Sequence, residues 1–220
     1  MIVTKIERQK KDPDRYSLFI DGSFAVGVRS AVLLRAGLRK GDDVSQETLG
    51  LLRTEEELGG ASAAALRYAG RRRRTEHEIR KKLTSLSFSP AAIEAAIAAL
   101  RVAGLADDRA FVRAFIHDAQ LHRPAGGRMI SHRLRSRGIP PDLLREEVAS
   151  ALGPGEEALL AERCAGFYLG KLEHRASSGR VFRQGEREAL LRRYLAGRGF
   201  CRSAVDAALK TALPSAERGG

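Results

Sequence analysis

The sequence has no tryptophan and no asparagine, and its only cysteines are Cys164 and Cys201. Two cysteines do not make a disulfide framework, and they suit a reducing cytosol. Aromatic residues make up 5% of the chain, which leaves few rings for stacking on bases and disfavours a dedicated platform for single-stranded nucleic acid. Without asparagine one common reader of adenine is missing, so we expect DNA contacts to be made to phosphates and to be largely blind to base sequence.

Long apolar runs are also missing. The longest, "AVLLRAGL" and "AAIEAAIAAL", contain charged residues and fall well short of a membrane span. The opening "MIVTKIERQKKDPD" has no apolar segment behind a basic start, so no secretory signal is expected. These absences predict a cytoplasmic protein without a membrane partner.

Catalytic and metal-binding patterns are absent as well. The chain contains no G-x-S-x-G and no H-E-x-x-H. The pairs Asp107–Asp108 and Glu156–Glu157 stand where helices are expected to begin, so capping is a better explanation for them than acid–base chemistry. His117 and His122 have no cysteine nearby, which argues against a metal site. We therefore expect no enzyme activity, no cofactor and no metal.

Basic residues are abundant and unevenly distributed. The chain carries 39 Lys and Arg against 27 Asp and Glu, a net charge of +12. Residues 1–60 contain equal numbers of the two signs, so the whole excess lies in residues 61–220. A polyanion or an acidic protein surface is the natural partner of the second part.

The first 60 residues indicate a small β-containing segment. "IVTKIERQ" alternates in hydropathy, and "RYSLFI" and "SFAVGV" flank Asp21–Gly22, a strong hairpin signal. Ser30 is expected to cap a short helix over "AVLLRAGL", which Gly37 or Gly41 would end. "SQETLGLLRTEEE" predicts a second short helix, followed by a hinge near Gly59–Gly60.

From residue 61 onward we expect helices only, arranged as a repeat. Apolar residues recur three times with the intervals four, five, five and four. Each step of four follows one helix face, and the steps of five cross a turn between helices. The three sets are Ile79, Leu83, Phe88, Ile93 and Ile97; Ile130, Leu134, Ile139, Leu144 and Val148; and Leu191, Leu195, Phe200, Val205 and Leu209.

Each unit also has an apolar helix ahead of this pattern: "ASAAALRYAG", "DRAFVRAFIHDAQL" and "EALLAERCAGFYLGKL". Thr75 and Glu78 fit a capping box that opens the middle helix of the first unit. The predicted fold is therefore mainly α, with three tandem three-helix repeats in an elongated array behind a β-hairpin segment. The predicted boundaries are 1–60 for the N-terminal segment, 61–106, 107–153 and 154–214 for the repeats, and 215–220 for a flexible tail.

Basic residues gather at the same place in each repeat, between the first two helices and just inside the second. A repeated cluster is the footprint expected of an extended anionic partner, although a solvated helix face remains an alternative. The candidate binding residues are Arg71, Arg72, Arg73, Arg74, Lys81 and Lys82 in the first repeat, Arg123, Arg128, Arg133 and Arg135 in the second, and Arg180, Arg183, Arg192 and Arg193 in the third.

Four stretches, in this order, carry a resemblance to a known family: "RRRRTEHEIRKKL", "GLADDRAFVRAFI", "SHRLRSRGI" and "YLAGRGF". They resemble the landmarks of the RecX family, cytosolic regulators of the RecA recombinase, over residues 61 to about 213. Ala69, Arg73 and Arg137 depart from the residues that are usual there. The resemblance implies tandem three-helix repeats, binding along the RecA filament, and modulation of its strand exchange and ATP hydrolysis in recombination, DNA repair and the SOS response.

Three functions remain open on the sequence. The first is a non-enzymatic, monomeric regulator that contacts the RecA filament and the phosphates of single-stranded or double-stranded DNA, and most simply inhibits the recombinase. The second is a sequence-nonspecific DNA-binding repeat protein that acts without a recombinase. It is weaker because the third helix "PAAIEAAIAAL" lacks the donors of a recognition helix. The third is a helical scaffold with an incidental basic side.

Overall fold

The computed structural model describes residues 1–122, 124–179, 181–183 and 185–213. The predicted tail at 215–220 lies outside them. The protein is mainly helical, with one three-stranded sheet at the N-terminal end. It divides into two compact units. Residues 1–73 and 79–106 form the first unit, and residues 74–78 together with those from 107 onward form the second.

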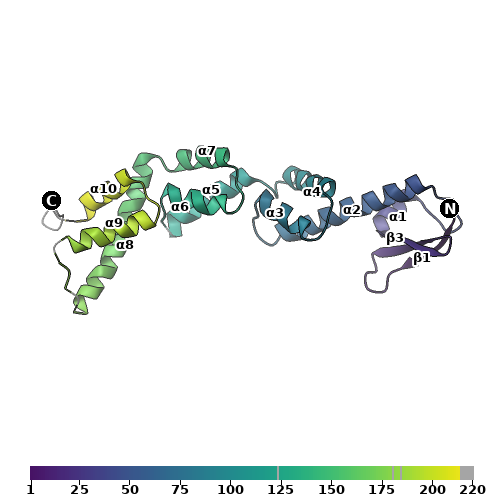
Figure 1. Ribbon diagram of the computed structural model, residues 1–220, viewed down its shortest axis with the longest axis horizontal. Coiled ribbons are helices and arrows are strands. Elements are labelled where there is room, and N and C mark those ends of the chain that lie inside the picture. Colours follow the sequence, from purple (N-terminus) through teal and green to yellow (C-terminus); the bar gives the residue numbers. More distant parts are fainter. Residues whose placement is uncertain (123, 180, 184, 214–220) are drawn as a thin grey trace. The chain divides into compact units, whose positions relative to one another are not determined.

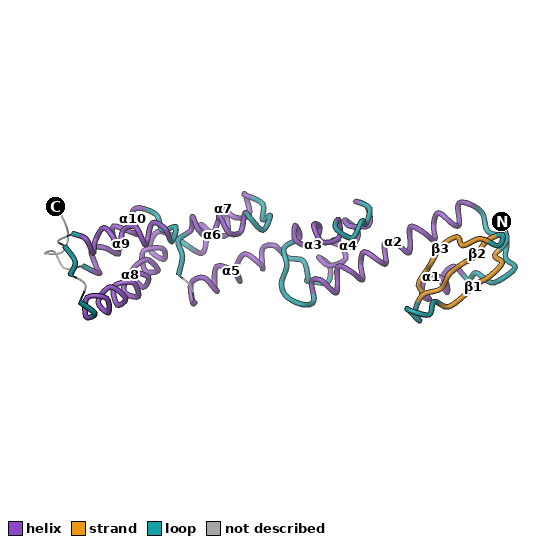
Figure 2. Tube along the Cα trace, turned by 60° about the horizontal axis from the view of Figure 1, so that its bottom comes forward, coloured by secondary structure: helices purple, strands orange, loops and turns teal. Residues whose placement is uncertain are grey.

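The N-terminal segment is an antiparallel sheet covered by helices. Its strands β1 (Val3–Arg8), β2 (Arg15–Ile20) and β3 (Ser23–Arg29) lie in the order β1-β2-β3 (Figure 2). The predicted hairpin is confirmed, because Asp21 and Gly22 both have positive φ angles, 46° and 83°, as a tight turn between twisted strands requires. Val3, Leu18 and Val28 pack with residues of the first helices into a separate hydrophobic core.

The first helix begins one residue earlier than expected. Helix α1 (Ser30–Ala36) begins at Ser30 itself, so the prediction of Ser30 as the N-cap is wrong. Arg29 holds the cap position, and the Ser30 hydroxyl donates to the carboxylate of Asp14 instead. The predicted end is confirmed, since Gly37 adopts the left-handed conformation after the last turn.

The two helices expected on either side of Gly59–Gly60 are one. Helix α2 runs without a break from Gln46 to Ala69, so the hinge prediction is wrong (Figure 1). The glycines serve close packing: a Cβ on Gly59 would lie 2.5 Å from the guanidinium of Arg29, and one on Gly60 would lie 3.2 Å from the ring of Phe88. The boundary at 60/61 stays a prediction, but it falls inside a continuous helix.

The rest of the chain forms the predicted repeats, each of three helices. The first uses the C-terminal half of α2 with α3 (Glu76–Thr84) and α4 (Pro90–Val102); the second has α5 (Asp108–His122), α6 (Gly127–Arg135) and α7 (Pro141–Ala151); the third has α8 (Pro154–Ser177), α9 (Glu186–Gly197) and α10 (Arg202–Ala212). Of the periodic apolar residues, all are buried except Phe88 and Val148, which are half-buried. The interval pattern therefore identified the core correctly.

A left-handed residue recurs in the turn between the second and third helices. The position is Ser87 in the first repeat, Gly138 in the second and Gly199 in the third, with φ of 62°, 78° and 81°. A Cβ on Gly138 would lie 2.2 Å from the ring of His77, and one on Gly199 would lie 2.4 Å from the backbone of Met129. Glycine is therefore required where the start of another middle helix, α3 or α6, packs onto the turn, whereas Ser87 shows that the turn alone tolerates a side chain.

Candidate nucleic-acid interface

Carboxylates fix the N-terminal ends of the middle helices, around which the basic residues gather. The Asp108 carboxylate, at the start of α5, accepts from the backbone N–H of Glu76 (2.9 Å) in α3. Glu157, near the start of α8, accepts from the N–H of Gly127 (3.0 Å) in α6. In both cases the acid satisfies an N–H that the helix itself cannot pair.

The capping predictions are therefore correct only in part. Asp107 caps its own helix, because it accepts from the N–H of Ala110 at 2.9 Å. Asp108 and Glu157 cap other helices, and Glu157 also accepts from the N–H of Cys201 (3.2 Å) at the start of α10. Sequence reasoning could not find this, since a carboxylate at a helix start has the same local pattern whichever helix it caps.

Thr75 is the predicted cap of α3. Its hydroxyl accepts from the N–H of Glu78 (3.1 Å) and donates to the carbonyl of Arg137 (2.8 Å), and the side chain is fully buried. Glu78, expected to complete the capping box, instead faces Arg74 and Arg137, each 3.7 Å away. Arg74 is thus one of the predicted binding residues that is half-buried and paired with a carboxylate.

In the first and third repeats, one arginine of the middle helix is neutralised by carboxylates of the same repeat. Arg80 of α3 makes two 3.0 Å hydrogen bonds to the carboxylate of Glu94 in α4. Arg192 of α9, which stands at the matching position, donates to Asp206 of α10 at 2.6 Å and to Glu188 at 3.1 Å. Arg192 is a predicted binding residue, and these bonds commit its guanidinium to holding two helices together.

The remaining predicted residues are exposed. Arg71–Arg73 lie in the connection between α2 and α3, and Lys81 and Lys82 lie on α3, all in the first unit. In the second unit the exposed members are Arg128, Arg133 and Arg135 on α6, Arg183 before α9, and Arg193 on α9. Arg123 and Arg180 fall outside the described residues.

One of these positions is basic in the first and third repeats and holds a histidine in the second. Equivalent positions on the three middle helices hold Lys81, His132 and Arg193. In the first and third repeats this position directly follows Arg80 and Arg192. Within the described part of the chain, Lys81, Lys82 and Arg193 form no ion pair, in contrast to their neighbours Arg80 and Arg192. A cation without a local carboxylate keeps its full attraction for an external anion.

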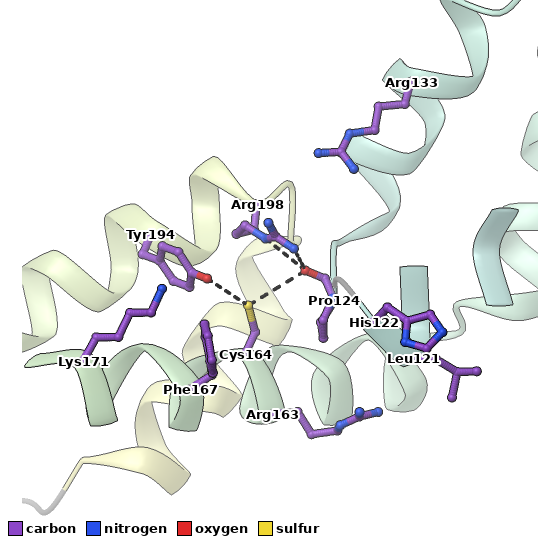
Figure 3. A pocket seen from close by; sticks show the side chains of 10 residues that line it. All are labelled: Leu121, His122, Pro124, Arg133, Arg163, Cys164, Phe167, Lys171, Tyr194 and Arg198. Atoms are coloured by element: carbon purple, nitrogen blue, oxygen red, sulfur yellow. Dashed lines mark hydrogen bonds between the residues drawn. The ribbon is translucent and has the colours of Figure 1, made fainter. Parts of the chain in front are cut away.

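A cavity of about 570 Å³ opens beside α6 in the second unit, and sequence reasoning missed most of its residues. Helix α8 lines it with Arg163, Cys164, Phe167 and Lys171, α9 lines it with Tyr194, and Arg198 lines it from the position directly after α9 (Figure 3). Arg133, already predicted, faces it from α6. The spacing of four between Arg163, Phe167 and Lys171 marks one helix face and was a usable signal.

A dense group of ion pairs joins α5 to α7 away from this cavity. Arg113 binds the buried carboxylate of Glu147 at 2.7 Å, and Arg109 binds both Glu147 and its neighbour Glu146. The hydrogen bond from Arg113 holds the pKa of Glu147 below its usual range, and the one from Arg109 does the same for Glu146. This group joins the first and third helices of the second repeat, and both of its arginines are paired with carboxylates.

The described residues hold no cluster of three or more histidine, cysteine or acidic side chains that could bind a metal ion. None of the described helices combines the length and apolar character that crossing a bilayer requires.

Comparison with known proteins matches three parts of the chain to family models. Residues 1–45 match the regulatory protein RecX N-terminal domain, residues 61–100 the first three-helix domain of RecX, and residues 107–146 its second three-helix domain. The "Regulatory protein RecX" of Levilactobacillus brevis is 30% identical over 192 residues, which cover 87% of this chain and 71% of that protein. The chain belongs to the RecX family.

Other comparisons agree with this membership. The "Regulatory protein RecX" of Clostridium botulinum strain Eklund 17B is 26% identical over 148 residues, or 67% of this chain and 69% of the relative. A solved structure described as "Crystal structure of regulatory protein RecX" superposes with a TM-score of 0.69 and 26% identity. It covers 95% of this chain and 98% of that one, so the resemblance in fold extends over the RecX repeats and the N-terminal sheet.

Proposed function

We propose that this RecX-family protein binds the filament that a RecA recombinase forms on DNA and inhibits its strand exchange and ATP hydrolysis. In this role it would act in the cytoplasm, as a monomer without catalytic activity, in recombination, DNA repair and the SOS response. The observation that supports the proposal best is that in the first and third repeats exposed cations without an ion pair, Lys81, Lys82 and Arg193, stand beside arginines that ion pairs neutralise.

A filament suits such a surface because it offers phosphates at regular intervals along its length. Repeated basic positions can each contact a separate phosphate, whereas a compact ligand would need them to converge. Exposed cations bind both strands of a duplex or a single strand through phosphates, so both forms of DNA are expected ligands.

Action on DNA alone is the weaker candidate. A helix-turn-helix needs donors on the exposed face of its recognition helix. The third helix α4 exposes alanines and Glu94, with Arg101 only near its end, and α7 exposes Asp142, Glu146 and Arg145, of which Arg145 is paired with Asp142. Most of these exposed groups are apolar, acidic or already paired, which favours binding through the middle helices.

Co-sedimentation with RecA filaments on single-stranded DNA tests the proposal. The double change Lys81→Glu with Lys82→Glu should lower the bound fraction and relieve inhibition of ATP hydrolysis. The pair Arg39→Glu with Lys40→Glu is the matched control, because it changes the net charge equally at exposed positions of the neutral N-terminal segment. Equal binding by both variants, with helicity unchanged, would contradict the proposal.

A further inference from the structure

The cavity of about 570 Å³ beside α6, which α8 lines, has a lining that selects for an anion. Five of its side chains carry or can carry positive charge: His122, Arg133, Arg163, Lys171 and Arg198. Among the residues that the structure describes, no aspartate or glutamate lines it. A concave surface lined by one sign of charge focuses the electrostatic field and concentrates ions of the opposite sign.

An exposed aromatic ring lies on the same lining. The side chain of Phe167 is 64% exposed, although large apolar side chains are normally buried. The ammonium of Lys171 lies over this ring, 4.5 Å from its centre, so one face of the ring already contacts a cation (Figure 3). A flat apolar ring beside a positive charge is suited to a ligand that is itself flat on one part and anionic on another.

The inner wall of the cavity is built rigidly. The Tyr194 ring stacks on that of Tyr168, with centroids 4.1 Å apart and planes 9° from parallel. The guanidinium of Arg198 donates to the carbonyl of Pro124 through Nε (2.9 Å) and Nη2, and the thiol of Cys164 contacts the same carbonyl at 3.9 Å. These contacts hold Arg198 and Pro124 in place, while Arg163 and Lys171 remain exposed for a ligand.

We propose that this cavity binds a nucleoside phosphate, with the base stacked on Phe167 and the phosphate held by Arg163, Lys171 and Arg133. Its volume, about 570 Å³, lies in the range of small-molecule and cofactor sites. Inorganic phosphate alone would leave the ring of Phe167 unused, and an apolar ligand would leave the cations uncompensated. A nucleotide uses both.

The nucleotide has two possible sources, a free mononucleotide or one unstacked unit of a DNA strand. The possibility that the nucleotide belongs to a DNA strand rests on the proposed function. The assignment of a nucleotide site does not. A second cavity of about 510 Å³ shares His122 and Arg133 with the first, which provides a path along which a strand could leave. Its lining includes Asp118, so the basic character is concentrated on the α8 side.

Phe167→Trp gives a direct test, because the natural chain has no tryptophan. The single indole keeps the stacking surface and reports on it. Deoxyadenosine monophosphate and a six-nucleotide oligo(dA) are titrated separately, without recombinase. Quenching by both, at similar concentrations of nucleotide unit, assigns the free nucleotide as ligand. Quenching by the oligonucleotide only assigns the strand.

Removal of the Phe167 ring is the second part of the test. Phe167→Ala should weaken binding of the effective ligand at least about fivefold, as removal of a base-stacking aromatic does. Phe24→Ala is the matched control, since Phe24 is 60% exposed and lies in the N-terminal sheet. Arg163→Glu should abolish binding with helicity intact.

The proposal is overturned if neither ligand quenches the indole, if Phe167→Ala binds as well as the natural chain, or if inorganic phosphate competes as effectively as the nucleotide. None of these results bears on filament binding, which Lys81 and Lys82 test separately in the first unit. If the double variant Lys81→Glu with Lys82→Glu lost filament binding but kept nucleotide binding, the assignment of the cavity would stand.

Discussion

At the scale of single residues, the middle helices are held by polar contacts that a sequence pattern shows only in part. The Thr75–Glu78 spacing predicted the cap of α3 correctly. The second bond of Thr75, to the carbonyl of Arg137, joins residues far apart in the chain, so no local pattern contains it. The same holds for Glu157, whose carboxylate serves two helices other than its own.

Thr75→Ala should lower the free energy of unfolding by about 2 kcal/mol. It removes an N-cap bond and leaves the partly buried N–H of Glu78 and carbonyl of Arg137 without their Thr75 partner. Thr75→Ser keeps the hydroxyl and should lose much less. Urea denaturation followed by circular dichroism measures both, and equal midpoints for the alanine variant and the natural chain would show that these bonds contribute nothing.

Gly138→Ala should cost more than a left-handed conformation alone, because its Cβ would collide with His77. Gly104→Ala is the control: Gly104 also has a positive φ, 67°, but open space around it, so only about 1–2 kcal/mol of backbone strain is expected there. Adding His77→Ala to Gly138→Ala should recover part of the loss. No recovery in the double variant would place the cost in the backbone alone.

At the scale of elements, the sequence predicted what depends on periodicity and local turn chemistry. The hairpin at Asp21–Gly22 and the helices of the three repeats follow from such signals. It did not predict the continuity of α2, because Gly59–Gly60 looks the same whether glycine bends a chain or admits a neighbour. Likewise, the face of α8 with Arg163 and Phe167 could be found by its spacing, but Arg133 reaches the cavity from another helix, and only tertiary packing brings them together.

The ion pairs between α5 and α7 should make stability depend on pH in the acidic range. The pKa of Glu147 is lowered in the folded protein, chiefly by its hydrogen bond to Arg113, so the stabilisation is fully present above the ordinary glutamate pKa of about 4.3. It is lost as the pH falls through the folded pKa. Glu147→Gln should therefore be less stable than the natural chain at pH 6, with the difference shrinking below about pH 4. Denaturant midpoints at pH 6 and 3.5 measure this, and a constant difference would exclude the pairing as its cause.

At the scale of the whole molecule, α2 belongs to the N-terminal sheet and to the first repeat at once. Glu56 binds the backbone N–H of Arg29 at 2.8 Å, and the next residue, Glu57, accepts from the N–H of Ser89 at 2.7 Å. One helix therefore carries contacts to β3 on one side and to the start of α4 on the other. A protein cut inside α2 loses contacts on both.

A chain beginning at Ala61 should still fold, because it keeps Ala61, Ala65 and Ala69, which pack in the core of the first repeat. It should melt at a lower temperature than a chain beginning at Gln46, since it lacks the Glu57 cap of α4 and half of α2. Circular dichroism melts of the two truncated proteins compare them. An unfolded 61–220 fragment would show that the first repeat needs the N-terminal half of α2.

The distribution of charge over the molecule leads to a prediction about salt. If exposed cations bind phosphates, the logarithm of the affinity for single-stranded DNA should fall linearly with the logarithm of the salt concentration, by about 0.7 per phosphate contacted. Changing Lys81 and Lys82 to alanine should reduce that slope by roughly 1.4, whatever the base sequence. Arg80→Ala should reduce it little, because Glu94 already compensates its charge.

Binding to a recombinase filament should keep a salt-resistant part, since contacts between proteins do not release DNA counterions. Fluorescence anisotropy across a salt series measures the slopes. If Arg80→Ala and the lysine pair changed the slope equally per charge, the ion pairs between helices would not determine which cations meet the DNA.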